Sequence, residues 1–414
     1  MTAANAATGT PAAGRTDRHV HEIDIVRILT FACVIGVHTF SGTNVATNPV
    51  SNGAEMLLHF TRESFFFLTG FVLMHQYGRR AYDLPRFWRR RMLLVGIPYL
   101  TWSVIYTFWR PVVEGHHWAT AAPKLGGNLL LGTAWYHLYF LLVSLQIYLI
   151  FPLLAWFVRA TRRHHVMLLA ASALLQVGLL SYLEYGPDFS GWAAGLGRHQ
   201  DVLIWNYQFW ILLGGVAGWH RQAVVAWVVG HRRPIGWLAL AGAALALAWY
   251  CGALVRGSDP IPAAAVLQPV MVPWSLAAIA GLFAIGTVYG QRRRPGRLAR
   301  TVSWASDRSF GIFLVHPLVL SALLWVGGHA VQHHVPNPFL SLGSYLVVVA
   351  GAIGLTELFR RGRASLMLTG RRQLAHSEHP NPPSRVDQPP IGHEPVPAAR
   401  QTVPVTPTKG SPDA

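Results

Sequence analysis

The sequence predicts an all-α protein that crosses a membrane many times, as a bundle of about ten helices. Only 12% of the 414 residues are charged, whereas soluble globular proteins have about 25%. The mean hydropathy is +0.33, and the apolar residues gather in runs that are long enough to cross a bilayer as helices. Positive charge is concentrated in alternate connections between these runs. These three observations favour a polytopic membrane protein.

Ten apolar runs are expected to form the spans. They cover, in order, residues 23–42, 56–77, 92–109, 134–157, 166–183, 202–219, 235–254, 270–289, 309–328 and 340–359. Each is close to the roughly 20 residues that a helix needs to cross the hydrocarbon layer. Most of the runs are predicted from length and composition alone, whereas the first four and the ninth also contain polar side chains that suggest a site.

The distribution of lysine and arginine predicts the orientation of the bundle. With the N-terminus placed in the cytoplasm, the cytoplasmic segments hold 25 of these residues and the outer loops hold 4. This asymmetry follows the positive-inside rule, so we expect an even number of spans and both termini in the cytoplasm. The net charge of +17 then reflects topology and contacts with anionic lipid rather than nucleic-acid binding.

The domain organisation is simple. Residues 1–20 and the proline-rich residues 373–414 are expected to be disordered tails, because neither segment can bury a core. Residues 21–362 are expected to form one membrane domain. Both cysteines, Cys33 and Cys251, fall inside apolar runs, which argues against disulfides. We expect no metal site, since the adjacent histidine pairs at 116–117, 164–165 and 333–334 have no carboxylate at ligand spacing.

The first span contains the strongest functional signal, the pair Arg27 and His38. An arginine at the centre of a membrane helix costs roughly 2.5–3.5 kcal/mol. The two residues share one helix face and are about 16 Å apart along the axis. Asp24 lies one turn before Arg27, close enough to interact with it. We expect this face to point into the bundle, with His38 in the outer half as general base or nucleophile.

The second and third spans carry further polar residues. Arg62 and Glu63 are expected near the outer end of the second span, and Gly70 permits close helix approach. Four arginines, Arg86, Arg89, Arg90 and Arg91, stand at the cytoplasmic start of the third span. Such a cluster suits phosphate groups, although composition alone favours the simpler interpretation, a topology signal that contacts lipid headgroups.

Aromatic residues and histidines mark the fourth and ninth spans. Trp135, Tyr136 and His137 stand at the outer start of the fourth span, where the aromatic rings suit either an interfacial belt or a sugar platform. His316 lies within the apolar ninth span, directly before Pro317, which frees a backbone carbonyl. A structural kink and a functional histidine are equally compatible with this pattern.

Four segments occur in a characteristic order. They are Ile23-Asp24 to Arg27 with His38-Thr39, Phe66 to Phe71, Tyr136 to Leu141, and Ser309 to Phe313 with His316. Together these segments resemble the acyltransferase 3 family of integral membrane proteins over about residues 21–360. The sequence departs from the family pattern at Thr69, where serine is usual, at Tyr139, where tryptophan is usual, and at Leu94, where many members have the second arginine of an Arg-x-x-Arg motif.

The resemblance implies a multi-pass enzyme of the plasma membrane that uses cytoplasmic acyl-coenzyme A, most often acetyl-coenzyme A, as donor. The acceptor would be a hydroxyl of a glycan, a lipid-linked sugar or a glycosylated small molecule. Arg86, Arg89, Arg90 and Arg91 would hold the donor phosphates. The donor would extend past Arg27 along a shared passage to His38, which acts as general base or carries the acyl group. Trp135, Tyr136, His137 and His316 would contact the acceptor.

Two other functions are compatible with the residues. A transporter or exporter of a small polar solute would also place arginine and histidine inside the bundle. A catalytically silent scaffold fits less well, because the Arg27–His38 face is costly to bury. Release of free coenzyme A in the presence of an acceptor distinguishes an acyltransferase from both.

Overall fold

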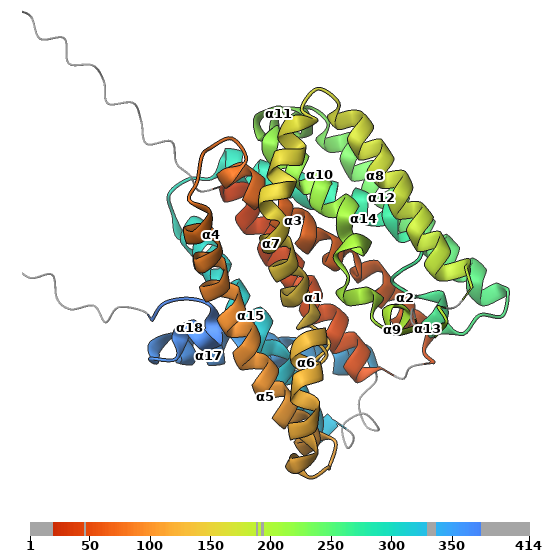
Figure 1. Ribbon diagram of the computed structural model, residues 1–414. Coiled ribbons are helices and arrows are strands. Elements are labelled where there is room, and N and C mark those ends of the chain that lie inside the picture. The colour runs from red at the N-terminus through yellow and green to blue at the C-terminus, as the bar shows by residue number, and fades with distance from the viewer. Residues whose placement is uncertain (1–19, 45–46, 188, 192–193, 329–336, 374–414) are drawn as a thin grey trace, which may run out of the picture. The chain divides into compact units, whose positions relative to one another are not determined.

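The computed structural model of the chain describes residues 20–44, 47–187, 189–191, 194–328 and 337–373. Within these residues the regular secondary structure is helical, and no strand occurs (Figure 1). The two predicted tails fall almost wholly outside the described residues, as does the histidine pair at 333–334. The helices therefore belong to the predicted membrane domain.

Eight helices in the described part of the chain are long and apolar enough to cross a membrane, and all eight coincide with predicted spans. They are α1 (His21–Thr43), the continuous helix formed by α4 (Leu84–Arg91), η1 (Met92–Gly96) and α5 (Ile97–Val113), α7 (Tyr139–Ala160), α8 (His165–Tyr185), α12 (Arg232–Val255), α14 (Met271–Arg292), α15 (Arg297–Leu323) with η6 (Leu324–Gly328), and α17 (Asn337–Arg361). The prediction of an all-α transmembrane bundle is confirmed.

The other two predicted spans, 56–77 and 202–219, differ from this group. They correspond to α3 (Phe60–Tyr77) and α10 (Gln208–Trp219), which are largely buried by other helices. With 12 residues, α10 is about 18 Å long, well short of the hydrocarbon layer of about 30 Å. The expected ten similar spans are therefore eight long helices and two shorter interior ones.

Glycines bring α3 and α10 into backbone contact. A Cβ atom on Gly214 would lie 2.0 Å from the carbonyl oxygen of Phe67, and one on Gly70 would lie 2.3 Å from that of Ile211. No larger residue fits at these positions without moving a helix. Small residues at membrane helix interfaces permit this close approach, so the predicted role of Gly70 agrees with the packing.

Shorter helices connect the long ones. On the predicted outer side are α2 (Pro49–Leu58), η2 (Trp118–Lys124), α6 (Leu125–Leu131), α9 (Ala194–Arg198), η4 (Gln200–Val202), η5 (Ile204–Tyr207) and α13 (Pro260–Ala263); on the predicted cytoplasmic side are α11 (Arg221–Gly230) and α18 (Ser365–Thr369). None of them carries a further long apolar run.

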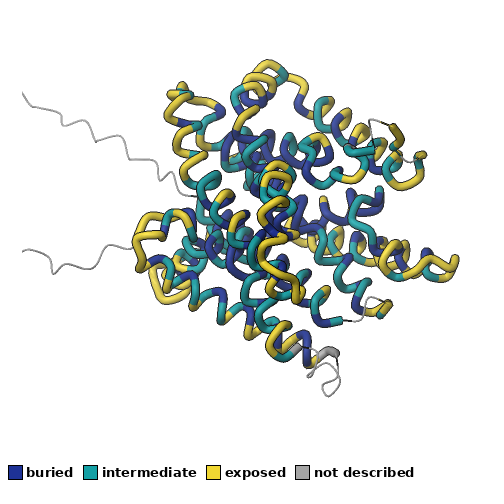
Figure 2. The backbone as a smooth tube through the Cα atoms, turned by 60° about the horizontal axis from the view of Figure 1, so that its bottom comes forward, coloured by how far each residue is buried: buried dark blue, intermediate teal, exposed yellow. Residues whose placement is uncertain are grey.

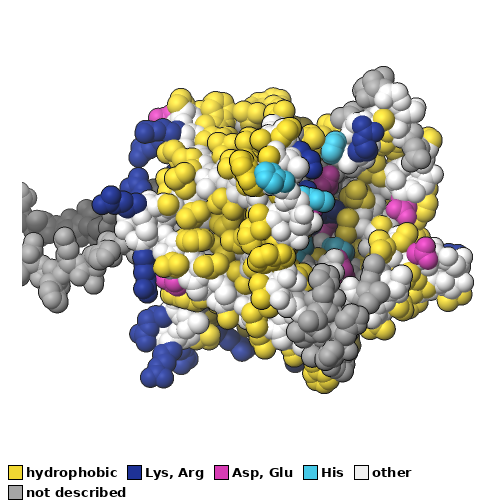
Figure 3. Space-filling model, turned by 90° about the horizontal axis from the view of Figure 1, so that it is seen from below, with side chains coloured by type: hydrophobic (Ala, Val, Ile, Leu, Met, Phe, Trp, Pro, Cys, Tyr) yellow, Lys and Arg dark blue, Asp and Glu magenta, His cyan; other side chains and the backbone are white. Residues whose placement is uncertain are grey.

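The surface of the bundle fits a bilayer. Large apolar side chains are exposed on α8 and α12, including Val166, Leu174 and Trp237, and the buried positions lie toward the interior (Figure 2). Lysine and arginine side chains gather along one edge of the face seen in Figure 3, and much of the remaining surface is apolar. Such an apolar band is costly in water and stable in lipid.

Candidate active site

A cavity of about 480 Å³ lies between α1, α3, η1, α7 and α15. Apolar side chains such as Phe31, Leu68 and Leu141 form much of its wall. Four arginines also line it, namely Arg27, Arg90, Arg91 and Arg371, against a single carboxylate, that of Asp24. An apolar cavity with excess positive charge suits an anionic ligand that has a long, less polar extension.

Arg27 is held at this cavity by a short chain of polar contacts. Its Nη1 donates a hydrogen bond to the Ser306 hydroxyl oxygen over 3.4 Å, and that hydroxyl donates to Asp24 Oδ1 over 2.7 Å. A guanidinium has five N–H donors, and within the described residues Ser306 is its one hydrogen-bond partner. Most of these donors are thus available to a ligand. Arg27 faces the bundle interior as predicted.

The four arginines of α4 separate into two groups. Arg90 and Arg91 line the cavity, whereas Arg86 and Arg89 are exposed outside it. Arg91 donates to Gln76 Oε1 over 3.3 Å and lies 5.4 Å from the centre of the Tyr148 ring, which orients its side chain. Arg89 and Arg91 are two positions apart and therefore project about 160° apart around the helix, and Arg86 lies one turn before Arg90, so the four cannot all reach one cavity.

Directly after Arg91 the helix widens into a π-helical turn, η1. Leu94 and Val95 of this turn line the cavity. Leu94 is the position where many members of the resembled family have arginine, so here an apolar side chain occupies that part of the wall. π-helical turns within α-helices are frequent at functional sites.

A cluster of three histidines lies further along α1. The ring of His38 stacks on that of His316 with 5.5 Å between centroids, and His137 lies 5.5 Å from His316. Tyr136 lies 4.2 Å from the His38 ring. His137 and His316 are fully buried, and His38 is half-buried. Residues from three separately predicted segments, His38, the pair Tyr136 and His137, and His316, are therefore neighbours.

Pro317 determines how His316 is oriented. Proline has no N–H, so the carbonyl of Phe313, four residues earlier, loses its usual helical partner. His316 Nδ1 lies 2.7 Å from this carbonyl oxygen. A carbonyl can only accept, so Nδ1 carries the proton and Nε2 of the neutral ring is left with a lone pair. Nε2 is buried and has no hydrogen-bond partner among the described residues.

The hydroxyl of Tyr106, on α5, is inserted between two backbone groups of α15 beside His316. It donates to the carbonyl oxygen of Leu314 over 2.8 Å and accepts from the backbone N–H of Leu318 over 3.1 Å. In a regular helix these two backbone groups would bond to each other. The inserted hydroxyl therefore replaces one helical hydrogen bond beside His316, a recognised cause of helix bending.

Phenylalanine rings separate the cavity from the histidines. Phe31 lies 5.1 Å from Phe313 and 6.1 Å from Phe65, centroid to centroid, and Phe65 lies 6.2 Å from Phe313. We call these three residues the aromatic cluster. Phe31 and Phe65 line the cavity, but His38 does not. The cavity at Arg27 therefore does not extend as far as His38, and these rings lie between the two sites.

The remaining aromatic residues of the fourth segment differ in position. Trp135 is buried and stacks on Tyr106, with 5.0 Å between centroids. Tyr136 is 41% exposed and is therefore the better placed of the two for contact with a ligand entering toward His38. Trp135 instead supports Tyr106 and, through it, the open turn of α15.

Arg62 and Glu63 stand near the start of α3, at its predicted outer end, and both are buried against other helices. Glu63 Oε1 accepts from Arg62 Nε over 3.0 Å and from Nη2 over 2.7 Å. Arg62 Nη2 also lies 3.0 Å from the Val266 carbonyl oxygen, and its guanidinium lies 5.5 Å from the centre of the Tyr207 ring. A paired, hydrogen-bonded charge can be buried at moderate cost.

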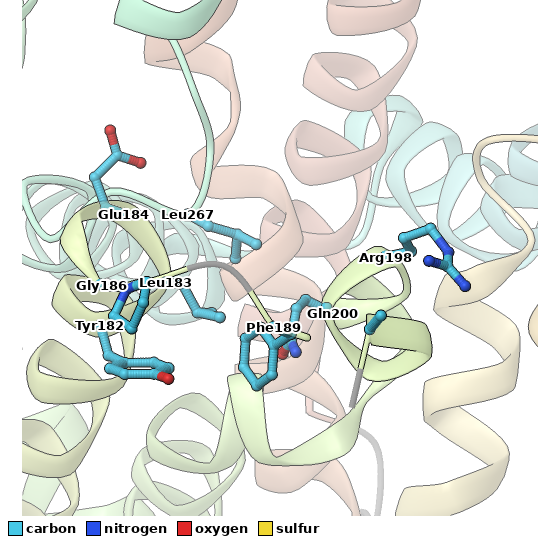
Figure 4. A pocket seen from close by; sticks show the side chains of 11 residues that line it. Tyr182, Leu183, Glu184, Gly186, Phe189, Arg198, Gln200 and Leu267 are labelled. Atoms are coloured by element: carbon cyan, nitrogen blue, oxygen red, sulfur yellow. The ribbon is translucent and has the colours of Figure 1, made fainter. Parts of the chain in front are cut away.

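A second cavity, of about 500 Å³, lies at the C-terminal end of α8 near α9 (Figure 4). Tyr182, Glu184, Phe189, Arg198, Gln200 and Leu267 are among its lining residues. It shares no lining residue with the arginine-lined cavity and contains none of the three clustered histidines.

The chain was compared with known protein families, curated proteins and solved structures. A family model described as an acyltransferase domain, Acyl_transf_3, matches residues 20–357 of the chain. The chain belongs to the acyltransferase 3 family. The matched region of this acyltransferase includes α1 to α15 and most of α17, and it ends before α18 and Arg371. No curated protein and no solved structure matches the chain.

Family membership confirms the resemblance and identifies a multi-pass membrane acyltransferase. The roles of individual residues stay predictions. Sequence reasoning missed Ser306, Tyr106 and Arg371, which contact or line the site. A serine in a basic connecting segment and a tyrosine in an apolar span are weak signals, and Arg371 resembles any basic residue that follows a last span. The prediction that no metal takes part also stays a prediction.

Proposed function

We propose that the protein transfers an acyl group, most often acetyl, from cytoplasmic acyl-coenzyme A to a hydroxyl group of an acceptor on the outer side of the membrane. One observation carries the proposal. The arginine-lined cavity and the histidine cluster lie along the same helix, with Arg27 at one and His38 at the other. This arrangement suits a long donor whose charged and reactive ends are far apart.

The arginine-lined cavity is the proposed donor site. Guanidinium groups form paired, charge-assisted hydrogen bonds with phosphate oxygens. Arg27, Arg90 and Arg91 would bind the phosphates, and the apolar wall would accommodate the rest of the donor. The acyl end must pass the aromatic cluster to reach His38, which stands seven positions after Phe31, about 10 Å further along the helix.

Two routes give the same products. In the direct route, the acceptor oxygen attacks the thioester carbonyl while its proton passes to an imidazole nitrogen of His38. The C–O ester bond forms, the C–S bond breaks, and the proton leaves on the sulfur as free thiol. In the carrier route, a His38 nitrogen first takes the acyl group and releases the thiol, and the acceptor oxygen then takes the acyl group from His38.

The histidine neighbours of His38 support either route. The lone pair on His316 Nε2 can accept a proton or a hydrogen bond from an acceptor hydroxyl. Tyr136 and His137 complete the surroundings of His38. We propose the plasma membrane as location, and a glycan, a lipid-linked sugar or a glycosylated small molecule as acceptor.

Thiol release from acyl-coenzyme A tests the proposal. Purified protein in proteoliposomes should release coenzyme A, and His38→Ala should lower the rate by about 10²–10⁴, the range for a general base. His164→Ala is the matched control, because His164 is exposed in the connection between α7 and α8, away from the histidine cluster, and it should retain the rate. Release by His38→Ala at the wild-type rate would reject the assignment.

Two further measurements extend the test. Labelled acyl groups that remain on the protein without acceptor would identify the carrier route, and their absence would identify the direct route. Mass spectrometry of envelope glycans and metabolites from a deletion strain should show a missing acyl mass on the acceptor. An unchanged acyl pattern would contradict the proposed transfer.

A further inference from the structure

The chain beyond the family-matched region returns to the arginine-lined cavity. After α17, residues 362–373 include α18 (Ser365–Thr369) and then Gly370 and Arg371. Arg371 lines the cavity together with Arg27, Arg90 and Arg91. Because the family match ends at residue 357, the contribution of Arg371 is not part of the matched domain.

Gly370 fixes this segment against the walls of the cavity. Its φ of +64° is a left-handed conformation that favours glycine. A Cβ atom there would lie 2.6 Å from the Phe310 ring and 2.7 Å from the carbonyl oxygen of Leu94. Phe310 and Leu94 both line the cavity, so the turn at Gly370 packs directly on α15 and η1.

Hydrogen bonds hold α18 in the same place. Trp102 Nε1 donates to the carbonyl oxygen of Leu368 over 3.0 Å, which ties α18 to α5. The Ser365 hydroxyl donates to the carbonyl oxygen of Arg371 over 2.9 Å, which closes the turn. Ser365 and Thr369 are buried. The backbone of Arg371 is thus positioned by packing and hydrogen bonds rather than left as a loose end.

The charge of Arg371 is only partly neutralised. Its Nε lies 3.4 Å from Asp307 Oδ1, and the side chain is 47% exposed. Asp307 also pairs with Arg360 and Arg308. Arg308 has a second carboxylate partner, Glu357. Two carboxylates among three guanidinium groups still leave a net positive charge beside the cavity, and an exposed pair contributes little attraction of its own.

We infer that Arg371, presented by α18 and the Gly370 turn, binds a phosphate group of the nucleotide end of the acyl donor. The inference rests on the proposed function, and it adds a binding residue from outside the family-matched region. Arg27, Arg90 and Arg91 contact the cavity from α1 and α4, and Arg371 contacts it from the C-terminal segment. A ligand with several phosphates can use all of these positions.

Binding of coenzyme A to the purified full-length protein tests the inference. Arg371→Gln should weaken binding by about tenfold or more, the loss expected for a charge-assisted hydrogen bond. Arg372→Gln is the matched control, since Arg372 is exposed and does not line the cavity, and it should change the affinity less than about twofold. Thermal unfolding should be similar for both variants.

Two more measurements sharpen the test. Gly370→Val keeps the guanidinium but strains the left-handed turn, so it should also weaken binding. Dephospho-coenzyme A, which lacks the 3′-phosphate, locates the contact: a loss confined to coenzyme A places Arg371 at that phosphate, and a loss with both ligands places it at the diphosphate.

If the wild-type protein binds coenzyme A and the Arg371→Gln variant binds it equally well, this inference is wrong and the proposed function is unaffected. Wild-type protein that binds no coenzyme A would overturn the proposed function, and this inference with it.

Discussion

Pro317 determines which nitrogen of the neighbouring His316 carries the proton. Pro317 frees the Phe313 carbonyl, the carbonyl accepts the Nδ1 proton of His316, and Nε2 is left as a base next to His38. The sequence indicated the first step, since proline frees a carbonyl wherever it stands in a helix. The second step could not be predicted, because it depends on the side-chain rotamer.

The variant His316→Asn distinguishes the roles of the two ring nitrogens of His316. Its amide N–H can still donate to the Phe313 carbonyl oxygen, but no basic nitrogen remains in place of Nε2. His316→Asn should therefore fold and lose transfer by about 10²-fold or more, as measured by coenzyme A release with acceptor. His316→Ala should also lower thermal stability, because the carbonyl is left unpaired. An active Asn variant would show that Nε2 is not used.

Tyr106 provides a second prediction for single residues. Tyr106→Phe removes the hydroxyl that bonds to both Leu314 and Leu318, so it should cost about 1–3 kcal/mol of unfolding free energy and slow transfer by disturbing His316. Tyr99→Phe, which loses one hydrogen bond to the Leu129 carbonyl, is the comparison. If the two variants are equally stable and Tyr106→Phe transfers normally, the Tyr106 hydroxyl does not have the proposed role in stabilising α15 and orienting His316.

At the scale of elements, α3 and α10 form the rigid interior of the bundle. Their contact depends on glycine, since the carbonyl oxygens of one helix occupy the space where side chains of the other would begin. The sequence indicated close approach at Gly70 but not its partner, because α10 was expected to be an ordinary span. The length of an apolar run predicts a helix better than it predicts which neighbour the helix contacts.

Alanine at Gly214 should disrupt this contact. Its Cβ would overlap the Phe67 carbonyl oxygen, so the loss of stability should reach at least the roughly 1–3 kcal/mol typical of overpacking. Gly178→Ala on α8 is the control, since a Cβ there meets nothing within 4 Å, and it should leave the melting temperature unchanged or slightly higher. Similar melting temperatures for both variants would contradict the packing.

The aromatic cluster gives a prediction about water. Phe65→Ala should open the space between the cavity and His38, and it should raise the release of coenzyme A without acceptor several-fold, because water then reaches the thioester. Phe60→Ala, which alters a separate apolar cluster beside Trp274, should not. Background release that stays at the wild-type level in Phe65→Ala would mean that this ring does not separate the two sites.

At the scale of the whole molecule, the composition and the lysine–arginine asymmetry predicted a membrane bundle, and eight of the ten spans were located correctly. The roles of the site residues stay predictions, but the structure brings several of them together: Arg27, Arg90 and Arg91 line one cavity, and His38 stacks on His316. Their grouping into a cavity and a separate histidine cluster arises from contacts between helices distant in sequence, which one sequence does not encode in any local pattern.

The predicted orientation can be measured by cysteine labelling. In a Cys33→Ser, Cys251→Ser background, Ser258→Cys should react with a membrane-impermeant maleimide added to intact cells, and Arg363→Cys should react only after permeabilisation. The charge asymmetry requires this result, because basic loops are retained in the cytoplasm. Labelling of Arg363→Cys in intact cells would reverse the assigned topology.

The closed aromatic cluster also has a consequence for the cell. A potential of 100 mV drives each elementary charge across a bilayer with about 2.3 kcal/mol, so an open pore through the bundle would let ions dissipate that energy. With Phe31, Phe65 and Phe313 in contact, the proposed cytoplasmic donor would bind at Arg27 without an open path for ions past these rings. The enzyme would then work across the bilayer without acting as a leak.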